Sequence, residues 1–163
     1  MDKLIRRKNN GMIKVITGIR RSGKTYLLFE LFYDYLIKSG VDKDHIIKIA
    51  LDDRINKKYR DPDVLCEYVH NEVKDDDMYY VLLDEVQMVS EFEDVLNSFL
   101  HLKNVDTYVT GSNAKFLSKD IITEFRGRGD QIHLFPLSFA EYMLGRGIDR
   151  QFDFLLKENS LEY

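Results

Sequence analysis

The sequence has little of several residues that define other kinds of protein. Its 163 residues include one cysteine, two prolines and no tryptophan. Cys66 alone cannot form an internal disulfide, so the fold must rest on a packed hydrophobic core. No internal repeat, low-complexity segment or Gly/Ser-rich linker divides the chain. We therefore expect one domain in a reducing, cytoplasmic compartment.

Long apolar runs are also missing. No stretch approaches the roughly 18 consecutive apolar residues of a membrane span, and the N-terminus lacks the apolar segment of a signal peptide. We expect no contact with a membrane. The histidines have no spacing typical of metal ligands, which predicts no metal site built by protein side chains alone. They are His45, His70, His101 and His133.

An excess of positive charge is absent too, since the formal net charge is -4. Nucleic-acid phosphates demand a basic surface, so the sequence predicts no general affinity for nucleic acid. One short basic run opens the chain. We expect this run to be solvated and assign it no function. Its members are Lys3, Arg6, Arg7 and Lys8.

Apolar, β-rich runs alternate with helical patterns along the chain. This alternation predicts a parallel sheet with helices between its strands. The five predicted strands span residues 12–17, 45–51, 78–83, 106–110 and 130–134.

Helix signals lie between these strands. We expect a first helix to end near Gly40, and Asp61 to cap a second helix that begins at Pro62. The first helix is predicted from apolar residues at helical spacing, which are Leu27, Leu28, Leu31 and Tyr35.

Two capping boxes are predicted farther on. Ser90 with Glu93 precedes one apolar helical pattern, and Ser138 with Glu141 precedes another. In such a box the serine and the glutamate each accept a hydrogen bond from the other's backbone N–H group.

A phosphate-binding pattern directly follows the first predicted strand. Gly18 and Gly23, followed by Lys24 and Thr25, match a P-loop, and the helix expected next points its N-terminus at the anion. Lys24 is expected to reach the β and γ phosphates, and Thr25 to offer its hydroxyl to Mg²⁺. Arg20 and Arg21 either touch phosphates or face solvent. The expected nucleotide-binding residues are Gly18, Ile19, Arg20, Arg21, Ser22, Gly23, Lys24, Thr25 and Tyr26.

Two acids follow the third predicted strand, which is apolar on both faces. Asp84 is expected to hold Mg²⁺ with Thr25, and Glu85 to orient or deprotonate a water that attacks the γ phosphate. Two acids after a strand also occur as a helix cap. The accompanying P-loop favours the catalytic interpretation, and Glu85 favours hydrolysis over transfer to an acceptor.

Two further polar segments follow. Ser112 and Asn113 come after the fourth predicted strand, where they contact the γ phosphate or the attacking water, cap a helix, or do both. Arg126 and Arg128 lie in a glycine-containing turn before the fifth strand. One of them is an arginine finger for another subunit's nucleotide, which implies a homo-oligomer, or the pair forms a solvated basic turn.

Together these segments resemble the prokaryotic AAA+ superfamily ATPases whose fuller members carry a nuclease-like C-terminal domain. The resemblance rests on VITGIRRSGKTYLL at 15–28, YVLLDEVQ at 80–87, VTGSNAKFLS at 109–118 and FRGRGDQIHLFPLSFAEY at 125–142, in that order. It implies a three-layer α/β/α P-loop fold with a mostly parallel five-stranded sheet in the order 5-1-4-3-2.

The resemblance also implies roles for named residues. Asn113, or Ser112 beside it, becomes the sensor, and Arg126 and Arg128 fall in the arginine-finger region. Residues 1–163 become an AAA+-like ATPase domain, expected to be the N-terminal part of a longer protein. The chain departs from the family in showing no later sensor arginine and no typical helical lid.

The leading functional hypothesis is Mg²⁺-dependent ATP hydrolysis, by an ATPase or an ATP-driven switch whose protein partner is unknown. A second hypothesis is a nucleotide-binding interaction module with little turnover. A third is a small-molecule P-loop kinase, against which Glu85 and the 110–113 segment weigh. The absence of an Asn-Lys-x-Asp motif favours ATP over GTP.

Overall fold

The computed structural model describes residues 1–111, 125 and 127–136. Their centre is a five-stranded sheet in the order β2-β3-β4-β1-β5, in which all neighbouring strands are parallel. This confirms the predicted order, read from the other edge, and each strand lies within one residue of its predicted range. The strands are β1 Ile13–Thr17, β2 Ile46–Ala50, β3 Tyr79–Asp84, β4 Val105–Thr110 and β5 Gly129–His133.

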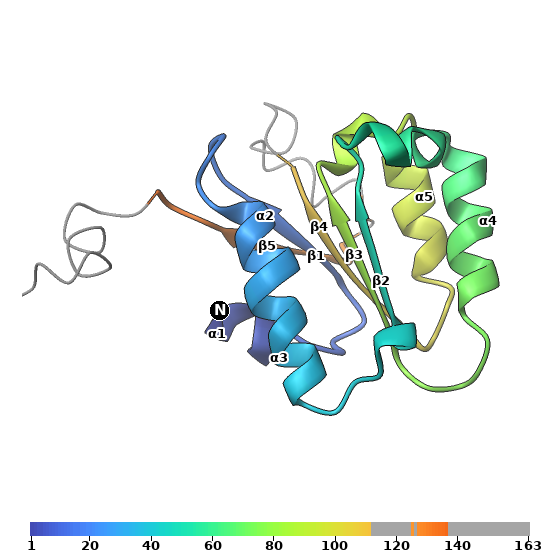
Figure 1. The fold of residues 1–163 in the computed structure, drawn as a ribbon, viewed down its shortest axis with the longest axis horizontal. Helices are drawn as coiled ribbons and strands as arrows, with labels where there is room; N and C mark the ends of the chain where they lie inside the picture. Colours follow the sequence, from blue (N-terminus) through green and yellow to red (C-terminus); the bar gives the residue numbers. More distant parts are fainter. Residues whose placement is uncertain (112–124, 126, 137–163) are drawn as a thin grey trace, which may run out of the picture.

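Helices cover both faces of the sheet and make three layers (Figure 1). One face carries the short α1 (Asp2–Arg6) and a continuous helical stretch of α2 (Lys24–Tyr26), the π-helix η1 (Leu27–Phe32) and α3 (Tyr33–Lys38). The other face carries α4 (Pro62–Glu72) and α5 (Phe92–Phe99). The remaining 3-10 turns are η2 Lys43–His45, η3 Arg54–Arg60 and η4 Val86–Met88.

The sheet separates two hydrophobic clusters. All residues of β1 and β3 are buried, because each of these strands packs against helices on both faces. Side chains that alternate along a strand therefore enter opposite clusters. Val81 and Leu83 join the cluster under α4 and α5, whereas Tyr80 and Leu82 join the cluster under α1 to α3.

The first helix ends near Gly40 as predicted, and Leu27 and Leu28 are buried, but Leu31 is not. Leu31 is exposed, while Phe29, Phe32 and Leu36 are buried. The π-helical segment η1 accounts for the change, because its i→i+5 hydrogen bonds rotate the later residues relative to an α-helical register. Leu31, one of the residues from which this helix is predicted, therefore lies on its exposed side.

Caps explain where the other helices begin. The Asp61 side chain accepts hydrogen bonds from the backbone N–H groups of Asp63 and Val64 (3.0 and 3.1 Å), which confirms the predicted cap at Pro62. The capping box at Ser90 is wrong. Glu91, in the left-handed conformation, is the N-cap of α5, so Ser90 lies outside the capping position and α5 has no side-chain cap. The box at Ser138 and Glu141 lies outside the described residues.

A buried polar network joins the strands at their amino ends. Lys14 and Asp106, both almost fully buried, form an ion pair. Asp106 also accepts hydrogen bonds from the Tyr108 hydroxyl (2.8 Å) and the Asn9 backbone N–H (2.9 Å). Burial lowers the pKa of Lys14, and the charge of Asp106 opposes that lowering. The pair is stable in the core only because both groups are fully paired.

The opening basic run is solvated only in part: Lys3 and Arg6 are exposed, as the sequence predicts, whereas Arg7 and Lys8 make contacts with other elements. Arg7 pairs with Asp130 at 2.5 Å. The Lys8 ammonium lies over the rings of Tyr35 and Tyr80, 5.8 and 5.7 Å from their centroids. These partners lie far along the chain, so sequence neighbours alone gave no sign of them.

No helix in the described part of the chain is long and apolar enough to cross a membrane.

Replacing Asp106 by Asn leaves the Lys14 ammonium buried without its counter-charge. We expect Asp106→Asn to lower the free energy of unfolding by about 3–5 kcal/mol, because the desolvation cost of Lys14 is then uncompensated. Equilibrium urea denaturation measures the loss. The exposed Asp76 gives a matched control, Asp76→Asn, with an expected change within about 0.5 kcal/mol. A loss below about 1 kcal/mol for Asp106→Asn would contradict this role.

Candidate functional site

The predicted P-loop connects β1 to α2 in a tight turn. Gly18 has φ +155°, and a Cβ atom there would lie 2.5 Å from the Leu134 carbonyl oxygen and 2.8 Å from Ser22 Oγ. No larger residue fits without moving the backbone. Gly23, directly before α2, has φ +86°, which residues with a side chain rarely adopt. The two glycines of the sequence pattern are therefore required by the shape of the loop.

Lys24 is the cation that this loop encloses. Its side chain is 4% exposed, and its Nζ donates hydrogen bonds to the carbonyl oxygens of Gly18 (3.0 Å) and Ile19 (2.9 Å). An ammonium group has three donors, so the geometry accounts for two of them. The charge is held at the loop backbone, where a bound anion would also meet the N-terminus of the following helix.

A buried carboxylate joins the loop to the middle of the sheet. Asp84, 2% exposed at the end of β3, accepts a hydrogen bond of 2.8 Å from Thr25 Oγ1 and another from Thr110 Oγ1. Burial raises the pKa of Asp84, and the nearby charges of Glu85 and Asp52 act in the same direction. The two threonine hydroxyls oppose this rise because they favour the ionised carboxylate.

Glu85 follows Asp84 in an uncommon backbone conformation. It has φ +54°, and its backbone N–H donates to Thr110 Oγ1 at 3.0 Å. The Gln87 Nε2 group donates a hydrogen bond to Glu85 Oε2. Thr110 and Gln87 therefore hold Glu85, a contact that the sequence analysis missed. The position of Gln87 two residues after Glu85 was the available sign of it.

A groove lies beside the P-loop, and sequence reasoning missed it as well. It has a volume of about 430 Å³ and lies between α1 and the residues that follow β5. Leu134 links groove and loop, because its N–H donates to the Thr17 carbonyl oxygen (2.7 Å) while its carbonyl oxygen faces Gly18. The apolar lining residues are Met1, Leu4, Leu27, Ile132, Leu134, Phe135 and Pro136.

The remaining predicted site residues differ in their placement. Ile19 and Tyr26 are 53% and 61% exposed, and Arg20 and Arg21 are exposed as well. Their side chains therefore face outward. Ser112, Asn113 and Arg126 lie outside the described residues.

Arg128 lies where the strands begin, whereas the P-loop lies where they end. Ile13 at the start of β1 pairs with Gly129, and the Ile13 N–H donates to the Arg128 carbonyl oxygen at 2.8 Å. The P-loop follows the other end of β1, about 13 Å away at 3.3 Å per residue. Arg128 is thus remote from the P-loop of its own chain.

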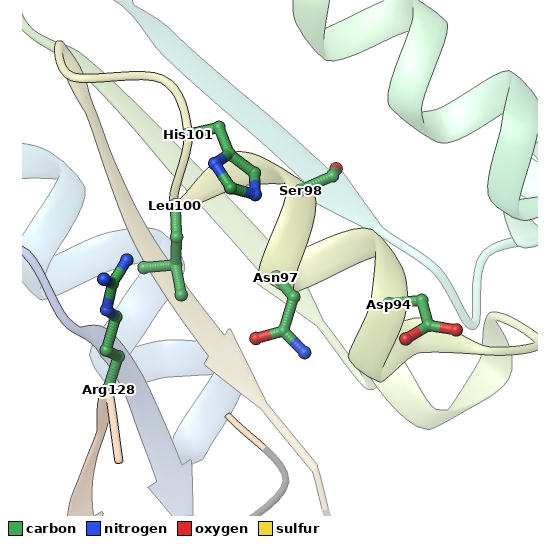
Figure 2. Close-up of a pocket in the computed structure, with 6 residues that line it drawn as sticks. All are labelled: Asp94, Asn97, Ser98, Leu100, His101 and Arg128. Atoms are coloured by element: carbon green, nitrogen blue, oxygen red, sulfur yellow. The ribbon is translucent and has the colours of Figure 1, made fainter. Parts of the chain in front are cut away.

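Arg128 borders a hollow of about 380 Å³ against α5. Figure 2 shows Arg128 entering from the start of β5, while the other lining side chains come from α5 and the turn after it. This hollow is formed by Asp94, Asn97, Ser98, Leu100, His101 and Arg128.

One histidine lies near two acids despite the lack of metal-ligand spacing. One ligand atom each from His45, Asp75 and Asp77 lie within 4.8 Å of one another. His45 Nε2 is 3.1 Å from both carboxylate oxygens of Asp75, so direct pairing accounts for the proximity of these two groups.

Comparisons with known proteins found a matching family model and related sequences. A family model described as an AAA domain matches residues 10–143. An uncharacterized protein of Haemophilus influenzae is 32% identical over 152 residues, covering 93% of this chain and 38% of that protein. An uncharacterized protein of Methanocaldococcus jannaschii is 30% identical over 157 residues, covering 93% and 33%. The chain therefore spans about a third of the length of these relatives.

A solved structure supports the fold. The structure of PCH-2 from C. elegans superimposes with a TM-score of 0.59 at 20% identity, covering 88% of this chain and 41% of that one. At this identity the likeness establishes the arrangement of strands and helices.

The raised pKa of Asp84 predicts a pH-dependent effect of its removal. Above its folded-state pKa the wild-type protein carries a desolvated charge, whereas Asn carries none. We expect Asp84→Asn to raise the melting temperature of the nucleotide-free protein at pH 8, with the gain shrinking as the pH falls through that pKa. Thermal unfolding between pH 4 and 8 measures this, with the exposed Asp63→Glu as control. A gain that is constant with pH, or absent at pH 8, would contradict the assignment.

Proposed function

The chain belongs to the AAA domain family, and from this premise we propose that it binds ATP with Mg²⁺ and hydrolyses the bond to the γ phosphate. Family membership implies nucleotide binding. The observation that carries the proposal is the 2.8 Å hydrogen bond between Thr25 and Asp84. It joins a phosphate-loop hydroxyl to a strand-end carboxylate 59 residues away, and two such oxygens side by side suit a hard divalent cation.

The P-loop supplies the phosphate contacts in this proposal. Backbone N–H groups of the loop, other than that of Ser22, which donates to the Ile19 carbonyl oxygen at 3.2 Å, face the phosphates in this proposal. Lys24 leaves the carbonyl oxygens of Gly18 and Ile19 to neutralise the β and γ oxygens. Arg20 and Arg21, exposed on the loop, add positive charge at its rim.

Thr25 and Asp84 fit the magnesium ion by their chemistry. When bound, Mg²⁺ supplies charge neutralisation between the phosphate oxygens. Asp84 must then be ionised, and its bonds from Thr25 and Thr110 favour that form.

Glu85 orients the attacking water in this proposal. Its carboxylate accepts a proton from the water as the γ phosphoryl group leaves, and the backbone contact with Thr110 sets its position beside Asp84. Asn113, with Ser112 beside it, is proposed to contact the γ phosphate from the segment after β4.

The groove between α1 and the end of β5 is proposed to hold the base of the nucleotide. Its volume of about 430 Å³ is within the range of small-molecule pockets, and Leu134 places it next to the P-loop. Apolar side chains such as Leu27 and Phe135 suit the faces of a flat heterocycle.

Arg128, with Arg126, is proposed to act on the nucleotide of a second copy of the chain. Its place at the amino ends of the strands argues against action on its own P-loop, which lies at their carboxyl ends about 13 Å away. A cation contributed in trans neutralises transition-state charge and makes turnover depend on assembly.

The roles of Lys24 and Glu85 separate binding from turnover. We expect Lys24→Ala to weaken Mg·ATP binding about 10- to 100-fold, because it removes a charge-assisted phosphate contact. Glu85→Gln is expected to keep binding within about threefold but lower kcat at least about 100-fold. Calorimetry and phosphate release measure these quantities. The exposed Lys38→Ala and Glu67→Gln are matched controls.

These measurements distinguish the candidate functions. Unchanged turnover in Glu85→Gln would contradict the role of Glu85. Tight binding by the wild-type chain without phosphate release would favour a nucleotide switch, and phosphate release that requires an added acceptor would favour a kinase.

Action of Arg128 in trans predicts complementation between two inactive variants. Lys24→Ala retains Arg128, and Arg128→Ala retains an intact P-loop. We expect each alone to release phosphate at least about tenfold more slowly than wild type, and an equimolar mixture to recover part of the rate because mixed interfaces pair the intact halves. The exposed Arg54→Ala is the control. A mixture that only averages its components would contradict action in trans.

A further inference from the structure

Arg7 connects the two walls of the groove beside the P-loop. It is the C-cap residue of α1, and the N-cap Met1 with Asp2 to Leu4 of the same helix forms one wall. Its NH1 group donates to Asp130 Oδ1 at 2.5 Å and to the Gln131 carbonyl oxygen at 2.9 Å. Asp130 and Gln131 belong to β5, whose continuation forms the other wall. One guanidinium group therefore holds both sides of the groove.

The segment after α1 is tied down at two further points. Asn10 Nδ2 donates to the second carboxylate oxygen of Asp130 at 3.2 Å, and its Oδ1 accepts from Lys14 Nζ at 3.1 Å. The Asn9 backbone N–H donates to Asp106. The chain that leaves α1 is thus fixed to β1, β4 and β5 before it enters the sheet.

α1 depends on these ties for its position. It has five residues and one fully buried side chain, Leu4, which packs in the cluster that contains Leu27 and Ile132. So short a helix does not hold its place through intrinsic helix stability. Leu4 supplies attraction to the sheet, whereas Arg7 fixes where α1 stands relative to β5.

We propose that Arg7 is a positioning residue for the nucleotide, because its contacts with Asp130 and Gln131 set the width of the groove that receives the base. This inference rests on the proposed function and deepens it. The phosphates bind elsewhere, at the P-loop, so Arg7 governs the part of the affinity that comes from the nucleoside. A basic residue of the opening run thereby acquires a function.

The exposure of this ion pair separates positioning from general stability. The side chains of Arg7 and Asp130 are 34% and 18% exposed. An ion pair with this access to water contributes little to global stability, and its loss leaves no fully buried charge. Variants at Arg7 are therefore expected to fold, unlike variants that break the Lys14–Asp106 pair.

The test compares two ligands that share the phosphates but not the nucleoside. We expect Arg7→Ala to weaken Mg·ATP binding about five- to tenfold and to leave Mg²⁺-tripolyphosphate binding within about twofold, because only ATP occupies the groove. Calorimetry on the 163-residue chain measures both affinities. Arg6→Ala, an exposed arginine on the same helix, is the matched control and is expected to change neither.

Two further variants test the contact itself. Asp130→Ala is expected to reproduce the loss, and the double variant with Arg7→Ala to add less than about twofold, because the Arg7–Asp130 ion pair is already absent in each single variant. Arg7→Lys is expected to recover part of the ATP affinity, since it keeps the charge but not the planar guanidinium donors.

The outcomes separate this inference from the proposed function. Equal losses for ATP and tripolyphosphate, or an unchanged ATP affinity in Arg7→Ala, overturn the positioning role while nucleotide binding stands. A wild-type chain that binds neither ligand overturns the proposed function and the inference with it.

Discussion

The buried carboxylate of Asp84 is the point on which the site depends. It lies at the end of β3, beside the central strand β4, and accepts hydrogen bonds from Thr25 of the P-loop and Thr110 of β4, so it joins three elements where the strands end. Burying the ionised form of this group costs free energy, as its raised pKa shows. The cost is typical of a group placed for chemistry and not for stability.

The contacts at the two ends of the parallel strands have different roles. At the carboxyl ends of the strands, the P-loop, Asp84 and Glu85 lie close together because all five strands are parallel and neighbouring strands end at the same side. At the amino edge, Lys14 and Asp106 pair in the core and fix the segment that follows α1. α1 extends from the Lys14–Asp106 network toward the P-loop. The contacts at the amino ends of the strands therefore also affect the shape of the groove beside the P-loop.

Several local predictions from the sequence failed where the backbone left its ideal form. The π-helical turn η1 exposes Leu31, and the left-handed Glu91 displaces Ser90 from the capping position of α5. Glu85 shows a related deviation, with a left-handed backbone beside Asp84. Spacing rules assume regular backbone geometry, so they cannot predict one extra residue in a helical turn or a residue with a positive φ angle.

The sequence by itself determined the sheet, its order through the family resemblance, the cap at Asp61, and the P-loop with Lys24 and Thr25. These depend on local chemistry and short repeats, which neighbouring residues carry in full. Only the tertiary structure decided that Thr25 meets Asp84, that Gln87 holds Glu85, and that Arg7 pairs with Asp130 between the two elements that line a groove. Each of these contacts depends on side-chain direction within the folded chain, and for Arg7 and Asp130, 123 residues apart, no local spacing rule relates the partners.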